Sequence, residues 1–264
     1  MKLIHLNVES FKYFDALVDF LEAEKPDVLS LVEATDGDFF DSRGQRRDYL
    51  GELKQRFGWN SVFHPTVFRD FWDYQIGFGA AVLSSSDIIV DNLDTLGDGI
   101  SVWAHDHLVF SDKPKYERYP YAWKWLFPFL VTHVQTEQGI IRLLTTHFHV
   151  SYECLETLQI WQDAEKIVEY LDTHDQNIPS ILTGDFNIRN ESMAIKILRE
   201  KMTQHSENFT NTLCRSIHPY FQNVPQGDGL GIDHIFTRNI SVSSCEVQEV
   251  AVSDHLPIIL NFDL

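Results

Sequence analysis

Apolar and polar positions along the chain predict strands and helices that follow one another in turn. Lys2–Val8 has the short apolar run of a strand, and Phe11–Leu21 then carries apolar residues at helical spacing. Pro26 ends that helix, and Asp27–Glu33 is typical of the next strand, so the chain opens with a β-α-β unit. A second helix is predicted over about Arg46–Phe57, because a glycine follows directly as a C-terminal stop.

The rest of the chain continues this alternation, apart from one aromatic-rich segment. Further strands are predicted near Trp59–Phe63, Gly79–Leu83, Ile88–Asn92, Ile140–Val150, Ser180–Thr183, Ile232–Thr237, Cys245–Val250 and Pro257–Phe262. The strongest helix pattern has Ser151 as its N-cap and an apolar stripe from Leu155 to Leu171. Gly99–Leu126 has Trp, Tyr and His without periodicity, which indicates a loop-rich excursion. We therefore predict a single α/β domain over residues 1–264, with two packed sheets and helices outside them.

Composition limits the partners of this domain. The chain has 264 residues, of which 44% are hydrophobic, so it can build a sizeable core. It carries 39 acidic against 21 basic residues, a net charge of −18, which argues against tight non-specific binding to duplex nucleic acid. Three separated cysteines argue against a disulfide framework or a cysteine zinc site. Neither a signal peptide nor a transmembrane run is evident, so we expect a soluble, cytoplasmic protein.

The polar residues that could carry chemistry share a position at the ends of predicted strands. They are Asn7, Glu33, His147, Asp185, Asn187, Asp233, Asp254 and His255. Carboxylates with amides and imidazoles, and without thiolates, suit a hard divalent cation such as Mg²⁺ or Mn²⁺. An aspartate can orient or deprotonate water, and an Asp–His pair can hold an imidazole against phosphate. This inventory predicts metal-dependent hydrolysis of a phosphate ester.

Each of these residues also has a structural explanation when it is taken alone, because Gly, Asp and Asn favour turns. His147 and His149 share one face of a strand and could form a transition-metal pair, although the usual continuations of such motifs are absent. His149 is then a structural neighbour of the site or a substrate contact. In the aromatic segment, Arg118 or Lys124 could steer an anion, while most of its rings are expected to pack beneath a loop.

Four short motifs, taken together, resemble those of a known family. They are Thr146-His147, Gly184-Asp185-Phe186-Asn187, Ile232-Asp233-His234-Ile235-Phe236 and Ser253-Asp254-His255-Leu256-Pro257. With Asn7 and Glu33 as the two N-terminal motifs, their order and spacing are similar to the endonuclease/exonuclease/phosphatase superfamily, the deoxyribonuclease I-like fold. The resemblance spans essentially the whole chain. One departure is Val32, where many members have Gln before the glutamate; it affects a secondary or substrate contact and not the metal ligand.

The resemblance implies a four-layered α/β sandwich and metal-assisted attack of water on phosphorus. It implies that Glu33 binds the metal, with Asp254 and Asn7 supporting it nearby. The expected cofactor is therefore Mg²⁺ or Mn²⁺.

The same resemblance assigns the remaining polar residues to water and phosphate. Asp185 positions or activates the water, and Asn187 hydrogen-bonds the phosphate. His147 contacts the phosphate oxygens, as does His255, which Asp233 orients. We favour a phosphodiesterase acting on nucleic acid or a small nucleotide. A phosphomonoesterase and a sphingomyelinase-like phospholipase are the enzyme alternatives. A catalytically silent binding module is the alternative of another class, disfavoured because no motif residue is lost.

Overall fold

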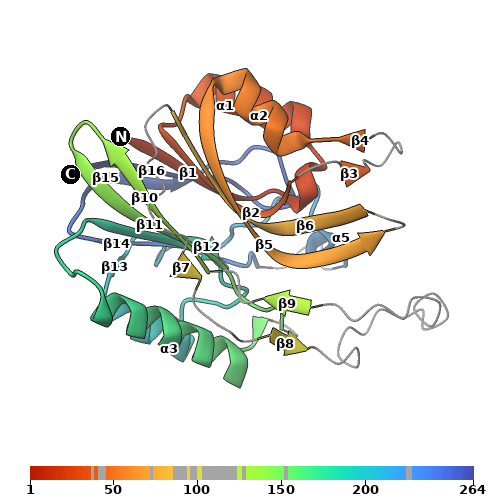
Figure 1. Ribbon diagram of the computed structural model, residues 1–264. Helices are drawn as coiled ribbons and strands as arrows, with labels where there is room; N and C mark the ends of the chain where they lie inside the picture. The colour runs from red at the N-terminus through yellow and green to blue at the C-terminus, as the bar shows by residue number, and fades with distance from the viewer. Residues whose placement is uncertain are drawn as a thin grey trace.

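Two β-sheets pack face to face, and helices cover the outer face of each (Figure 1). The computed structural model describes residues 1–36, 39–40, 46–71, 74–85, 94–95, 100–102, 124–126, 129–151, 154–223 and 228–264. Both chain ends lie on the same side of the molecule (Figure 1). The predicted four-layered α/β sandwich is confirmed.

The first sheet contains both chain termini. Its strands, in spatial order, are β15 (Ser241–Val247), β16 (Ile258–Asp263), β1 (Lys2–Asn7), β2 (Val28–Asp36), β6 (Tyr74–Ser85), β5 (Trp59–Phe71), β9 (Lys124–Leu126) and β8 (Ile100–Val102). Among the described strand pairs of this sheet, only β1 and β2 are parallel. A parallel pair is what the predicted β-α-β unit requires.

The second sheet continues from the middle of the chain. In order it contains β13 (Thr203–Gln204), β14 (Asp233–Arg238), β12 (Ser180–Asp185), β11 (Gly139–His147), β10 (Phe129–Thr136) and β7 (Asp94–Thr95). A separate short ribbon joins β3 (Phe39–Phe40) to β4 (Arg46–Arg47). The parallel pair β11–β12 is the second predicted β-α-β unit.

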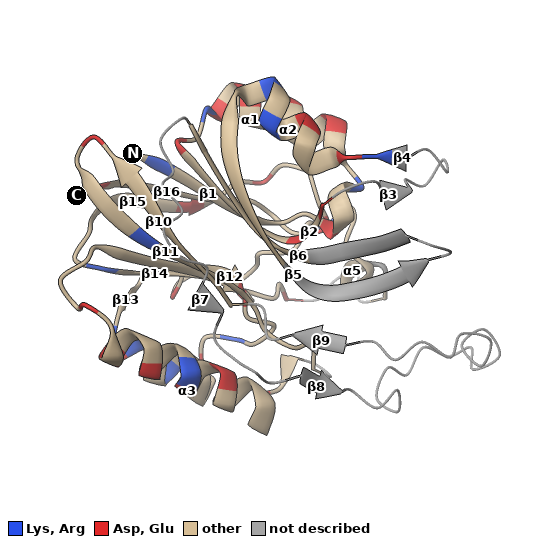
Figure 2. Cartoon of the chain, viewed as in Figure 1, with Lys and Arg blue, Asp and Glu red and all other residues tan. Residues whose placement is uncertain are grey.

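Helices close the two outer layers. The 3₁₀ turn η1 (Glu9–Phe11) and the helices α1 (Phe14–Glu24) and α2 (Tyr49–Phe57) pack on the first sheet. The helices α3 (Leu158–Thr173) and α4 (Met193–Arg199) pack on the second, and α5 (Pro219–Asn223) follows the loop that leaves β13. Acidic side chains predominate on the exposed surface of α1, where the negative charge of the chain is visible (Figure 2).

The two sheets are joined by a largely apolar inner layer, which includes Leu3, Val82, Leu143, Ile181, Ile235 and Leu260. A small polar link crosses it. The hydroxyl of Ser30 in β2 lies 2.8 Å from that of Thr145 in β11 and 2.7 Å from that of Thr183 in β12. These buried hydroxyls satisfy one another, so they fix the sheets against each other without leaving an unpaired group.

Two helices begin later than the pattern predicts. Asp48 caps α2 by accepting a hydrogen bond from the amide of Gly51 at 2.9 Å, and residues 46–47 belong to β4 instead. The N-cap of α3 is Thr157 and not Ser151, so the predicted stripe was wrong at its start. Leu155 and Leu158 are 60% and 71% exposed.

A contact from another helix explains the late start of α3. Glu156 accepts hydrogen bonds from the amides of Met193 and Ala194, at the N-terminus of α4. A carboxylate there satisfies amides that have no partner within the helix. The segment before α3 is therefore held by α4 and is not part of the helix.

Several predictions concern residues outside the described ranges. The predicted strand at 88–92, Arg118 and most of the aromatic segment lie there, whereas the two ends of that segment form β8 and β9, which pair with each other. Within the described part of the chain, no helix is long and apolar enough to cross a membrane.

Candidate active site

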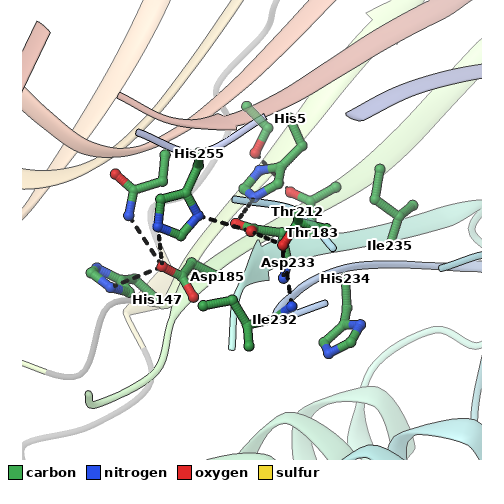
Figure 3. A network of polar contacts seen from close by, with 12 residues as sticks. His5, His147, Thr183, Asp185, Thr212, Ile232, Asp233, His234, Ile235 and His255 are labelled. Atoms are coloured by element: carbon green, nitrogen blue, oxygen red, sulfur yellow. Dashed lines mark hydrogen bonds and ion pairs between the residues drawn. The ribbon is translucent and has the colours of Figure 1, made fainter. Parts of the chain in front are cut away.

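Strand ends from both sheets bring the predicted polar side chains together (Figure 3). The β11–β12 register places His147 opposite Asp185, and the β12–β14 register places Asp185 opposite Asp233. Asn7 ends β1 of the other sheet, and His255 comes from the loop before β16. Asp185 therefore lies at the centre of a cluster built from five separate segments.

Asn7 connects the carboxylates of the two sheets. Its Nδ2 donates to Oε1 of Glu33 at 3.0 Å and to Oδ2 of Asp185 at 3.1 Å. Its Oδ1 accepts from the backbone amide of Glu9 at 3.1 Å. Asn7 is only 2% exposed, and its contact with Asp185 is fully buried. Asn7 thereby keeps two carboxylates close that would otherwise repel each other.

Glu33 owes its position to a bulge in β2. The β2–β6 register shifts between Leu31 and Ala34, and Glu33 has a positive φ of 53°. The left-handed region costs a non-glycine residue roughly 1–2 kcal/mol, and bulges that re-aim a side chain are common beside active sites. The preceding Val32 is fully buried, whereas the Glu33 side chain is 36% exposed and reaches the cluster.

The Gly184–Asn187 turn fixes the end of β11 as well as its own residues. Asn187 donates its backbone amide to Oδ1 of Asp185 at 3.0 Å and its side-chain amide to the carbonyl of Phe148 at 2.9 Å. The Phe148 amide in turn donates to the carbonyl of Asp185 at 2.8 Å. Both backbone groups of Phe148 are thus bound, which holds the neighbouring His147 in place.

Asp233 orients His255. The Nδ1–H of His255 donates to Oδ2 of Asp233 at 2.8 Å, and the hydroxyl of Thr212 donates to the same oxygen at 2.5 Å. This leaves Nε2 of His255 facing Oδ2 of Asp185, 3.6 Å away. Nε2 of His147 lies 3.6 Å from that same oxygen and 3.8 Å from Oε1 of Glu33. It is buried and lacks a hydrogen-bond partner among the described residues.

Burial and neighbouring charges shift the pKa values of Asp185, Asp233 and His255 in different directions. Burial raises the pKa of Asp185, and the charge of Asp233 adds to the effect, while the two imidazoles oppose it. Burial would also raise the pKa of Asp233, but the charge and hydrogen bond of His255 hold it well below its usual range. Burial would lower the pKa of His255, but the carboxylates of Asp233 and Asp185 keep it well above 6.5.

Asp254 lies close to both His255 and His218. Its Oδ1 accepts from the Ser253 hydroxyl at 3.2 Å, and its Oδ2 lies 3.9 Å from Nε2 of His218. Burial raises the pKa of Asp254 to about 6; the charge of His255 opposes this, and the charges of Glu9 and Glu33 add to it. Burial also lowers the pKa of His218 to about 4, with a further contribution from the charge of His255.

These donors fit a hard divalent cation. The charges of Glu9 and Glu33 both oppose ionisation of Asp254, and Oε2 of Glu9 is buried without a hydrogen-bond partner among the described residues. A cation would offset that repulsion, and oxygen donors are those that Mg²⁺ and Mn²⁺ prefer. Within the described chain, the triads whose donor atoms all lie within 4.8 Å are His218–Asp254–His255 and Asp185–Asp233–His255; neither contains Glu33.

His149 is anchored away from this cluster. Its Nδ1 lies 3.2 Å from Oδ2 of Asp163, a fully buried carboxylate of α3, and Gln159 donates to the other oxygen of that carboxylate at 2.8 Å. Neither metal-capable triad of the described residues includes His147 or His149. Arg118, the other predicted substrate contact, lies outside the described residues.

Four residues join the site without having been singled out in the sequence: His5, Glu9, Thr212 and His218. His5 is 1% exposed, and its Nε2 lies 3.8 Å from Oδ1 of Asp233. The sequence signal for His5 and Glu9 is their spacing of two from Asn7, which continues past the end of a strand. Thr212 and His218 have no local signal, because a loop brings them to the site.

That loop is bound closely to the last motif. The Cys214 amide donates to the Asp254 carbonyl at 2.7 Å, and the Leu256 amide donates to the Thr212 carbonyl at 2.7 Å. Leu213 also forms an isolated β-bridge with His255. The 212–218 segment is therefore a fixed wall of the site.

Comparisons with known proteins identify the family of this chain. The model of the Endonuclease/Exonuclease/phosphatase family matches residues 4–255. No match to the chain was found among curated proteins.

Several solved structures share the fold. The human Nocturnin catalytic domain with bound sulfate anion has 15% identity and a TM-score of 0.65, covering 100% of this chain and 93% of that one. A mannosyl-6-phosphatase of Bacteroides thetaiotaomicron has 13% identity and a TM-score of 0.66, with 100% of both chains covered. An endonuclease/exonuclease/phosphatase of Beutenbergia cavernae has 19% identity and a TM-score of 0.68, covering 100% of this chain and 71% of that one. Identities this low establish the fold alone.

Proposed function

Since the chain belongs to the endonuclease/exonuclease/phosphatase family, whose members hydrolyse phosphate esters, we propose that it is a phosphodiesterase that uses Mg²⁺ or Mn²⁺. One observation carries the proposal. The Asp185 carboxylate lies 3.6 Å from each of two imidazoles, His147 and His255, and accepts a hydrogen bond from Asn7. Water attack on phosphorus needs a carboxylate that accepts the proton of the water and nearby groups that donate hydrogen bonds to the phosphate oxygens. Asp185 and the two imidazoles provide this arrangement.

Asp185 takes the proton of the attacking water. Its raised pKa makes it a better proton acceptor than an exposed carboxylate, and its position is fixed by Asn7 and by the backbone of Asn187. Water attacks phosphorus, its proton passes to Asp185, and the bond between phosphorus and the leaving oxygen breaks. The leaving oxyanion then takes a proton from solvent.

Three side chains hold the phosphate oxygens. His255 donates through Nε2 because Nδ1 is committed to Asp233, and its raised pKa keeps it cationic near neutral pH. His147 offers Nε2, which has no hydrogen-bond partner among the described residues. Asn187 uses one amide hydrogen on Phe148 and retains the other for the substrate. Hydrogen bonds preorganised in a dry site stabilise charge that develops in the transition state.

Glu33, Asp254 and Asn7 would hold the metal ion, and Glu9 would contribute to the negative charge that attracts it. Once bound, the ion would supply positive charge that offsets the negative charge developing on the phosphate.

Nucleic acid or a small nucleotide is the proposed substrate class, with Arg118 as a further contact. His149 is not assigned a substrate contact, because Asp163 anchors it away from the cluster. The net charge of −18 favours a short or single-stranded substrate over tight, non-specific binding to a duplex.

The test compares bis(p-nitrophenyl) phosphate with p-nitrophenyl phosphate, each with Mg²⁺, Mn²⁺ or EDTA. We expect metal-dependent hydrolysis of the diester, abolished in Asp185→Asn and retained in Asp19→Asn, a matched change on the exposed surface of α1. The loss in Asp185→Asn should reach about 10²–10⁴-fold in kcat/KM.

The other outcomes favour different functions. Hydrolysis of the monoester alone would replace the diesterase with a phosphomonoesterase. If neither ester is cleaved while Mn²⁺ still binds at Glu33, screening with oligonucleotides and phospholipids decides between a more selective enzyme and a binding module. Diester hydrolysis that persists in EDTA would contradict the metal requirement.

A further inference from the structure

We propose that His218 is a further catalytic residue, which donates a hydrogen bond to the leaving-group oxygen of the substrate. This inference rests on the proposed phosphodiesterase function.

The ring of His218 is held by its own turn. Its Nδ1 accepts a hydrogen bond from the backbone amide of Tyr220 at 3.1 Å. The His218 amide donates to the Cys214 carbonyl at 2.8 Å, and its carbonyl accepts from the Phe221 amide at 3.1 Å. Because Cys214 is itself bound to the Asp254 backbone, the imidazole is fixed relative to the active site.

These contacts determine which ring nitrogen carries the proton. A nitrogen that accepts a hydrogen bond has no proton, so the His218 proton resides on Nε2. This nitrogen lies 3.9 Å from Oδ2 of Asp254, too far for a hydrogen bond to that oxygen. The His218 ring meets the His255 ring at 78°, with 5.7 Å between centroids, and the His218 side chain is 22% exposed. It therefore presents an N–H donor at the wall of the site.

The position of His218 relative to Asp185 indicates which substrate oxygen its Nε2–H can contact. His255 belongs to both donor triads of the described residues, with Asp185 in one and His218 in the other. His255 thus neighbours both the proposed base and His218, which share no triad with each other. In phosphoryl transfer the attacking and leaving oxygens lie roughly in line through phosphorus. With water at Asp185 and an equatorial oxygen at His255, His218 is placed for the leaving oxygen. It donates a hydrogen bond and keeps its proton.

Two variants distinguish the loss of the Nε2–H donor from a disturbance of the turn that holds His218. His218→Asn places an acceptor near the Tyr220 amide but withdraws the donor from the site. His218→Gln restores a donor near the position of Nε2. Both are assayed with methyl p-nitrophenyl phosphate and methyl phenyl phosphate, which transfer the same group and differ only in the leaving group.

Phenolate holds more charge on its oxygen than p-nitrophenolate, so the lost hydrogen bond should matter more for it. We expect the kcat/KM of His218→Asn to fall at least about ten-fold further for methyl phenyl phosphate than for the p-nitrophenyl ester, with His218→Gln recovering part of the difference. An equal loss for both esters, or none, would overturn the proposal. So would a fall in Mn²⁺ affinity measured without ester, because His218 would then be a metal ligand.

A binding measurement distinguishes failure here from failure of the proposed function. If the wild-type protein cleaves neither ester, the phosphodiesterase proposal fails for these substrates. Calorimetric titration of methyl phenyl phosphate in EDTA then decides on His218. Weaker binding by His218→Asn than by the wild-type protein and His218→Gln supports the contact. Equal affinities, or no binding by the wild-type protein, overturn it.

Discussion

Nδ1 of His255 lies 2.8 Å from Oδ2 of Asp233, and the two side chains are only 6% and 1% exposed. The contact sets both the tautomer and the charge of the imidazole: the proton on Nδ1 is fixed by the carboxylate, and the pKa of His255 is held well above 6.5. The same contact holds the pKa of Asp233 well below its usual range. The pair is therefore a cationic imidazole on an anionic support, directed at Asp185.

Replacing Asp233 with Asn should remove that support while preserving the side-chain volume. The amide supplies no charge, so His255 loses its raised pKa. Once it is neutral, the amide oxygen in the place of Oδ2 keeps the single ring proton on Nδ1 and leaves Nε2 without one. We expect kcat/KM for bis(p-nitrophenyl) phosphate to fall by about 10²–10⁴-fold. A raised histidine pKa keeps the proton until pH exceeds the folded value. Wild-type activity should therefore persist well above pH 6.5, whereas that of Asp233→Asn should decline from about pH 6.5 upward. Asp228→Asn, an exposed matched change, is the control; a loss under three-fold in Asp233→Asn would contradict the role.

The sequence predicts the Asp233–His255 pair because both residues belong to short motifs at the ends of strands. Asp185 and Asp233 lie opposite each other because their strands pair within one sheet, whereas Asn7 ends a strand of the other sheet and reaches Asp185 because the two sheets pack face to face. His218 was not predictable, because its approach depends on a loop bound to residues 254–256 by backbone hydrogen bonds. The start of α3 was not predictable for a similar reason: Glu156 serves a different helix, and no local pattern records that contact.

Asp254 should destabilise the metal-free protein at neutral pH. Its pKa rises from 3.8 to about 6 on folding, so the folded state binds the proton more tightly, and stability falls as pH rises from about 4 to 6. At about 1.4 kcal/mol for each pH unit, the cost above pH 6 is on the order of 2–3 kcal/mol. In EDTA, Asp254→Asn should therefore be more stable than the wild-type protein at pH 7.5 and equal to it below pH 4, as measured by urea denaturation.

Mn²⁺ should reverse the order of these two proteins. An ion at one thousand times its Kd stabilises the folded state by about 4.1 kcal/mol, more than the cost of ionised Asp254, and only the wild-type protein retains the Asp254 ligand. Asp19→Asn should follow the wild-type protein throughout. Equal stabilisation of Asp254→Asn by Mn²⁺ would remove Asp254 from the metal site.

Gly184 should tolerate no side chain. A Cβ there would lie 2.2 Å from the carbonyl oxygen of Thr146 on the adjacent strand, and backbone cannot rotate away from it. Gly184→Ala should cost about 1–3 kcal/mol and displace the next pair in the register, His147 and Asp185, lowering kcat/KM by roughly 10²-fold. Gly58→Ala is the contrast: its Cβ meets nothing within 4 Å, and only its φ of +67° opposes the change, so it should cost about 1 kcal/mol without affecting activity. Similar activities for both variants would show that the strand spacing does not position the site.

Asn7 should be more important as an uncharged donor than as a metal ligand. Its Nδ2 donates to both Glu33 and Asp185, and an aspartate there would replace two hydrogen bonds with a third carboxylate about 3 Å from the others. In EDTA we expect Asn7→Asp to lose at least about 1–3 kcal/mol in urea denaturation, more at pH 8 than at pH 5, where protonation relieves the repulsion. Mn²⁺ should recover more stability in Asn7→Asp than in the wild-type protein, since the added charge strengthens cation binding. Asn177→Asp on the exposed surface controls for the change in net charge. If Asn7→Asp loses the same stability with and without Mn²⁺, the ion is not held beside Asn7, and the metal site must be assigned to Asp254 and His218 instead.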